Sequence, residues 1–115
     1  MEPGGARYPL SQLRRGVLEY CVLSLLVDED RYGFDLVRRL GEVDGMVTSE
    51  GTIYPLLSRL RREGWVATRW AESETGPPRR YYAITPAGRR ALMAFADEWR
   101  RFRDAVDQLL PGASE

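Results

Sequence analysis

The sequence has no histidine, no lysine and a single cysteine, Cys21. Without imidazole it lacks the commonest general base and the commonest metal ligand. One thiol cannot form an intramolecular disulfide, and one thiol without a histidine leaves almost nothing from which to build a zinc site. Cys21 lies in an apolar run, where cysteine packs as a small hydrophobic side chain. We therefore expect neither an enzyme nor a metal or cofactor site.

Long apolar runs and an excess of charge are also missing. The sequence has no run of about 18 apolar residues and no signal peptide at its start, so we expect a cytoplasmic protein without a membrane partner. The 17 arginines balance 17 acidic residues, for a net charge of +0. Neutrality counts mildly against nucleic-acid binding but does not exclude it, because the position of the charges matters more than their total.

The stretch over residues 49–64 is the centre of the predicted fold. On a helical period its apolar residues are spaced i, i+3, i+4, i+7 and form one stripe: Ile53, Leu56, Leu57 and Leu60. The opposite face carries Thr52, Pro55, Arg59 and Arg62. This face of small, hydroxyl and guanidinium groups suits a nucleic-acid groove. A solvated surface face is the alternative.

Two starting points for this helix stay open. Ser49 and Thr52 both have hydroxyls that can accept hydrogen bonds from the free N–H groups of a first turn. Pro55 favours the later start at Thr52, because proline lacks an N–H and is harmless only in the first turn. Gly64 is suited to end the helix in a left-handed conformation.

Residues 11–85 are predicted to form one winged helix-turn-helix domain, behind a flexible arm of residues 1–10. Ser11 is a cap for a first helix that is apolar on nearly every side, and residues 32–43 form a second helix. Together with the helix over 49–64 they make a helix-turn-helix arrangement.

The wing follows directly after the central helix. Residues 65–70 and 79–85 are rich in β-branched and aromatic side chains, and a polar turn with glycine and proline separates them. They predict a small β-hairpin in an otherwise mainly α fold. Arg79 and Arg80 lie just past the tip, where they can enter a minor groove or hold the DNA backbone.

A last helix is predicted over residues 86–110, with Thr85 as its cap and Pro86 as its first residue. Its apolar residues recur in alternating steps of three and four: Leu92, Phe95, Trp99, Phe102, Val106 and Leu109. Such a seam is typical of a helix that packs on a partner helix. It predicts a homodimer through this helix, and a seam that folds back on its own domain is the alternative. Residues 111–115 form a short tail.

Three blocks of sequence carry a family resemblance. They are Tyr32-Gly33, the G-T-I-Y-P…R-L…G-W-V block from Gly51 to Val66, and the G-P-P-R-R-Y-Y…T…G block from Gly76 to Gly88. With these blocks the chain resembles the PadR family of bacterial transcriptional regulators, in its short subfamily with a single long C-terminal helix. The resemblance implies a dimeric repressor that occupies a pseudo-palindromic operator in double-stranded DNA and is released by a ligand.

The resemblance also implies which residues face DNA. The expected DNA contacts are Ser49, Thr52, Tyr54, Pro55, Arg59, Arg62, Arg79 and Arg80. The three hydroxyl side chains would hold phosphates. Arg59 or Arg62 would contact a guanine edge, which discriminates by roughly 1–3 kcal/mol.

A ligand site at the dimer seam is implied in the same way. Trp99 corresponds to a tryptophan that faces its symmetry mate in several short members, where two indoles can enclose a planar aromatic molecule. Leu92, Phe95 and Leu23 would line the apolar walls, and Glu19 or Arg103 would set the charge preference. The alternative is that Trp99 only packs the dimer core.

A second function remains open, in which the winged helix is a protein–protein assembly module without a ligand response. The neutral net charge favours it. The arginines and hydroxyls of the central helix count against it, because an assembly helix would more commonly present apolar or aromatic anchors.

Overall fold

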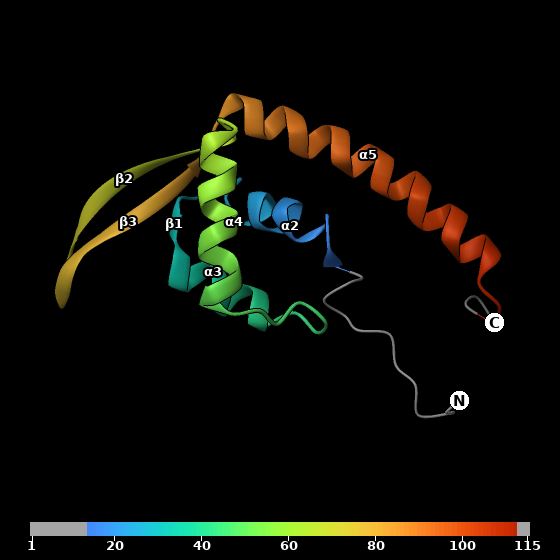
Figure 1. Ribbon diagram of the computed structural model, residues 1–115, viewed down its shortest axis with the longest axis horizontal. Coiled ribbons are helices and arrows are strands. Elements are labelled where there is room, and N and C mark those ends of the chain that lie inside the picture. The colour runs from blue at the N-terminus through green and yellow to red at the C-terminus, as the bar shows by residue number, and fades with distance from the viewer. Residues whose placement is uncertain (1–13, 113–115) are drawn as a thin grey trace.

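The computed structural model describes residues 14–112, and its elements are four helices and a three-stranded antiparallel sheet (Figure 1). The elements in chain order are α2 (Leu18–Leu25), β1 (Arg31–Tyr32), α3 (Gly33–Gly41), α4 (Glu50–Arg62), β2 (Val66–Ser73), β3 (Gly76–Ile84) and α5 (Pro86–Leu109). The expected winged helix-turn-helix with a long C-terminal helix is confirmed.

The first predicted helix is interrupted. Residues 14–17 form a turn in which Gly16 has a φ of +84°, and α2 begins only at Leu18. A residue in the left-handed backbone conformation cannot continue a right-handed helix, and glycine adopts this conformation without steric cost. The expected cap, Ser11, lies outside the described residues.

The sheet contains one strand more than the predicted hairpin. Arg31 pairs with Tyr82 and Tyr32 pairs with Tyr81, so β1 adds to the free edge of β3 and gives the order β1-β3-β2. The same two residues lead directly into α3, which covers Gly33–Gly41 rather than 32–43.

The start of the central helix that Pro55 favoured, with Thr52 as the cap, was wrong. Helix α4 begins at Glu50 with Ser49 as its N-cap residue, and the carbonyl of Ser49 accepts from the N–H groups of Thr52 and Ile53. Pro55 therefore lies inside the helix, where it cannot donate to the carbonyl of Gly51. Gly51 is exposed, so water can serve that carbonyl instead.

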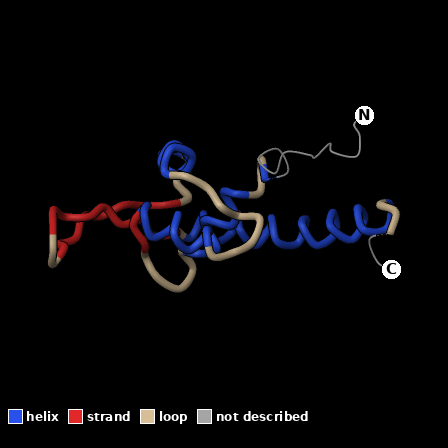
Figure 2. The backbone as a smooth tube through the Cα atoms, turned by 90° about the horizontal axis from the view of Figure 1, so that it is seen from below, coloured by secondary structure: helices blue, strands red, loops and turns tan. Residues whose placement is uncertain are grey.

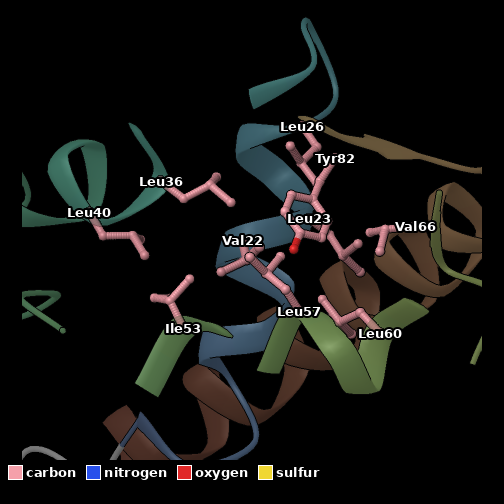
Figure 3. Packing of buried hydrophobic residues seen from close by; sticks show 10 residues of the cluster. All are labelled: Val22, Leu23, Leu26, Leu36, Leu40, Ile53, Leu57, Leu60, Val66 and Tyr82. Carbon is pink, nitrogen blue, oxygen red and sulfur yellow. The ribbon is translucent and has the colours of Figure 1, made fainter. Parts of the chain in front are cut away.

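Helix α2 lies at the centre of the hydrophobic core (Figure 3). Side chains from α2, α3, α4, β2 and β3 converge on it: Val22, Leu23, Leu26, Leu36, Leu40, Ile53, Leu57, Leu60, Val66 and Tyr82. The whole apolar stripe predicted for α4 faces this core, with Leu56 only partly buried. The stripe thereby fixes which face of α4 is left exposed.

A buried ion pair joins the start of α3 to the end of α2. Arg31 donates to the carboxylate of Asp35 at 2.9 Å and to the carbonyl of Leu25 at 2.7 Å. Burial alone would raise the pKa of Asp35, but hydrogen bonds from Arg31 and Arg38 outweigh burial and hold that pKa below its ordinary value. The charged pair thus fixes β1 and α3 against α2.

The predicted cap of the last helix is confirmed. The Thr85 hydroxyl accepts from the N–H of Gly88 at 3.0 Å and donates to the carbonyl of Gly64 at 2.6 Å, and Pro86 is the first residue of α5. This double contact ties the start of α5 to the end of α4. From there α5 extends away from the domain on the side opposite the wing (Figures 1 and 2). No helix within residues 14–112 has both the length and the apolar character to cross a membrane.

Candidate nucleic-acid interface

Helix α4 and the wing enclose a basic recess, which we call the wing-side recess. It has a volume of about 420 Å³ and is lined by Ser58, Arg61, Arg62, Arg80 and Tyr82. A smaller recess of about 330 Å³ adjoins it, lined by Tyr32, Gly33, Tyr54, Trp70, Arg79, Arg80 and Tyr82. The exposed face of α4 and one face of the wing therefore form a continuous surface of arginine, hydroxyl and aromatic groups.

The arginines of this surface keep their charge available. Among residues 14–112, no carboxylate forms an ion pair with Arg61, Arg62, Arg79 or Arg80. Arg79 lies over the ring of Tyr32 at 4.5 Å, and Arg80 lies 6.0 Å from the ring of Trp70. The Nε of Arg80 is buried and has no hydrogen-bond partner among the described residues. Aromatic rings thus orient the guanidinium groups of Arg79 and Arg80 without neutralising their charge.

Tyr54 owes its position to Gly33. A Cβ atom at residue 33 would lie less than 3.0 Å from the Tyr54 ring, so only glycine lets the ring lie across the start of α3. Tyr54 remains 40% exposed, so its hydroxyl is reachable from solvent. Burial, reinforced by the nearby Glu50, raises the pKa of Tyr54.

Arg59 lies on the flank of α4 toward α2, where it is half-exposed and paired with carboxylates. Its guanidinium pairs with Glu19 of α2 at 2.5 Å and lies 3.8 Å from Glu63. It lines a third recess of about 420 Å³, the α2-side concavity, formed by Arg14, Arg15, Gly16, Leu18, Glu19, Thr52, Pro55, Leu56, Arg59 and Arg62. The other predicted DNA contacts on the helix and its cap are exposed: Ser49, Thr52, Tyr54, Pro55 and Arg62.

Ser58 and Arg61 also belong to this surface, although sequence reasoning left them out. Both are exposed and both line the wing-side recess. Helical spacing could have indicated them, since Ser58 follows Pro55 by three residues and Arg61 follows Tyr54 by seven.

The residues predicted for a ligand site separate into two groups. Leu92, Phe95, Trp99 and Arg103 line a concavity of about 490 Å³ between α2 and α5, together with Tyr20 and Cys21. Leu23 is fully buried in the domain core, and Glu19 points to Arg59, so neither residue lines this concavity. Helix α2 turns Leu23 toward the core and Glu19 toward α4.

Aromatic rings connect α2 with α5 at the rim of that concavity. Tyr20 stacks on Phe95 with a centroid distance of 4.1 Å and an interplanar angle of 2°, and Trp99 follows Phe95 at 6.2 Å. Farther along α5 the seam residues are uncovered, with Phe102 64% exposed and Leu109 83% exposed.

This arrangement defines a class of protein. A helix-turn-helix core followed by a wing is the fold of a winged-helix transcriptional regulator. Residues 22–94 match the transcriptional regulator PadR-like family. The chain belongs to this family.

Its similarity to known proteins spans nearly the whole chain. A PadR-like transcriptional regulator from Bacillus cereus is 38% identical with a TM-score of 0.79, over 88% of this chain and 98% of that one. A PadR family transcriptional regulator from Eggerthella lenta is 37% identical with a TM-score of 0.78, over 90% of this chain and 89% of that one. A transcriptional regulator of Mycobacterium tuberculosis is 30% identical over 105 residues, which are 91% of this chain and 94% of that protein.

Proposed function

We propose that this regulator represses transcription by binding, as a homodimer, to a pseudo-palindromic operator. The observation that carries the proposal is the set of unneutralised arginines facing one another across the wing-side recess. In this arrangement α4 enters a major groove, and Arg79 and Arg80 of the wing hold the adjacent backbone or minor groove. Arg62, which is exposed on the front of α4, contacts a guanine edge in place of Arg59.

The exposed seam of α5 supports the dimeric part of the proposal. The seam residues Phe102 and Leu109 are large apolar side chains left exposed in a single chain, and exposed apolar surface of this kind indicates an interface. A two-fold partner places two recognition helices at half-sites about 34–36 Å apart, one turn of the double helix.

A planar aromatic effector is the second part of the proposal. The concavity that contains Trp99 and Phe95 is largely apolar and is rimmed by Arg100 and Arg103. A flat ring bound between Trp99 and its symmetry mate changes the separation of the two α4 helices. A change of a few ångströms prevents the two helices from docking in both half-sites at once.

DNA binding is tested first with the wild-type protein. DNA from the region upstream of its own gene and an unrelated fragment of equal length are titrated across a salt series, and the oligomeric state is measured by sedimentation. We expect a dimer that prefers the upstream DNA and whose affinity falls steeply with salt. Equal and weak binding to both fragments calls for selection of sites from random DNA. If that selection enriches no sequence, the protein–protein assembly module becomes the better interpretation.

The Trp99→Ala variant separates effector binding from DNA binding. We expect it to bind the operator within about twofold of wild type while losing its response to a planar aromatic dye that is neutral or anionic and does not intercalate into DNA, because stacking energy at the seam is removed. Operator affinity is measured with and without dye, and dye binding by fluorescence. Loss of the dimer or of operator binding in this variant would show that Trp99 packs the dimer core instead.

A further inference from the structure

The α2-side concavity lies on the flank of α4 away from the wing, and it is strongly basic apart from one residue. Four arginines line it: Arg14, Arg15, Arg59 and Arg62. Within the described part of the chain, Glu19 is the one acidic residue of its lining. Thr52 and Pro55, which belong to the exposed face of α4, form its rim. The concavity therefore adjoins the surface that is proposed to meet DNA.

The four arginines differ in what holds them. Arg14 donates to the carbonyls of Gly45 and Val47 in the loop before α4, and Arg59 pairs with Glu19. Arg15 and Arg62 form no ion pair with any carboxylate of residues 14–112. Of the two arginines that α4 contributes to the concavity, one is thus neutralised and one is free.

Glu19 is well placed to keep Arg59 neutralised. Its side chain is only 14% exposed, whereas that of Arg59 is 42% exposed, so the carboxylate is the more buried partner of the pair. The residue next to it, Tyr20, stacks on Phe95 of α5 and so fixes this end of α2. A second carboxylate, Glu63, lies 3.8 Å from Arg59.

An unpaired arginine at this place would change how the protein chooses DNA. Contacts to phosphate add affinity for every sequence and carry no sequence information. A non-operator complex has no base contacts to fix its register, so it can shift until a further free guanidinium beside Arg62 reaches a phosphate, whereas base contacts hold an operator complex in place. Non-operator binding would therefore gain more than operator binding, and the ratio between the two affinities would fall.

We propose that Glu19 is a specificity-determining residue, which holds Arg59 off the DNA backbone and so limits binding to non-operator sequences. The inference rests on the proposed operator binding and assigns to α2 a role in choosing the site. It also turns Arg59 from an expected base contact into a restrained charge.

The Glu19→Gln variant tests the proposal, because glutamine keeps the size of the side chain and an acceptor for Arg59 but removes the negative charge. We expect affinity for a non-operator duplex to rise about fivefold or more at low salt. The slope of log affinity against log salt should become steeper by about 0.9, the value for one additional phosphate contact. The ratio of operator to non-operator affinity should fall.

Two further variants assign the effect to Arg59. Glu42→Gln removes the same charge from the end of α3, where Glu42 lies 3.7 Å from Arg38, and should leave both affinities and the slope unchanged. Glu19→Gln combined with Arg59→Gln removes the released guanidinium and should restore the wild-type slope and non-operator affinity. Thermal unfolding of each variant shows that the fold is retained.

Three results would overturn the inference. The first is a salt slope in Glu19→Gln that equals the wild-type slope. The second is a fall in the affinity of Glu19→Gln for both operator and non-operator DNA, which would show that Glu19 supports the position of α4. The third is a double variant that binds non-operator DNA as tightly as Glu19→Gln alone. A wild-type protein that binds no DNA at low salt would instead contradict the proposed function itself.

Discussion

Replacing Arg61 and Arg80 together by glutamine is expected to weaken binding to operator and non-operator DNA alike by roughly 100-fold at low salt, since a charged hydrogen bond contributes about 1.5–3 kcal/mol. Both guanidinium groups line the wing-side recess, one from α4 and one from β3, and neither is paired with a carboxylate of residues 14–112. Two lost phosphate contacts should also reduce the salt slope by about 2 units. The measurement is the same salt titration, with both DNA fragments.

A matched control separates this effect from the change in net charge. Arg90→Gln combined with Arg101→Gln removes two positive charges from exposed positions of α5, away from the recess. This control variant should keep the wild-type slope of log affinity against log salt. If the Arg61 and Arg80 variant keeps the wild-type slope, those arginines do not contact phosphates and the proposed docking surface is wrong.

The Gly88→Ala variant is expected to lose about 3 kcal/mol or more of its free energy of unfolding, at the upper end of what overpacking costs. A Cβ atom at residue 88 would lie less than 3.0 Å from the carbonyl oxygen of Trp65 and from the side chain of Ile84. That oxygen cannot move freely, because it accepts a hydrogen bond from the N–H of Thr85 at 3.0 Å. The first turn of α5 must therefore shift, and with it the Thr85 contacts that tie α5 to α4.

Thermal unfolding measures this loss, which corresponds to roughly 10 °C or more in Tm. Gly41→Ala is the control, because Gly41 is helical, has an ordinary φ and leaves open space within 4 Å of the position that a Cβ atom would take. Removing a helical glycine of this kind should raise stability by about 0.5 kcal/mol. A Gly88→Ala protein as stable as wild type would mean that α5 is not held at this point.

Periodic features were predictable from the sequence for direct physical reasons. The spacing of Ile53, Leu57 and Leu60 placed one face of α4 in the core, since a helix brings residues three and four apart onto one side. The Thr85–Pro86 pair marked the start of α5, because proline at the first position loses no hydrogen bond. The hairpin followed from two runs of β-branched and aromatic residues around a polar turn.

Features that depend on a distant residue were missed or misplaced. The two residues of β1 are too few to show an alternating pattern, and they form a strand only because the edge of β3 is available to them. The central helix starts at Glu50 despite Pro55, because the buried stripe outweighs the loss of one hydrogen bond at an exposed glycine.

The sequence by itself determined the class of this protein. The periods of its helices, the hairpin after the recognition helix and the blocks from Gly51 to Val66 and from Gly76 to Gly88 are local properties that need no partner to be recognised. Only the tertiary structure decided which arginines have a carboxylate partner among residues 14–112. Arg59 and Arg61 look alike in the sequence, but α2 brings Glu19 to the first and the wing brings Arg80 beside the second. The charge that an arginine offers depends on what the fold places next to it, and those neighbours lie about 20 to 40 residues away along the chain.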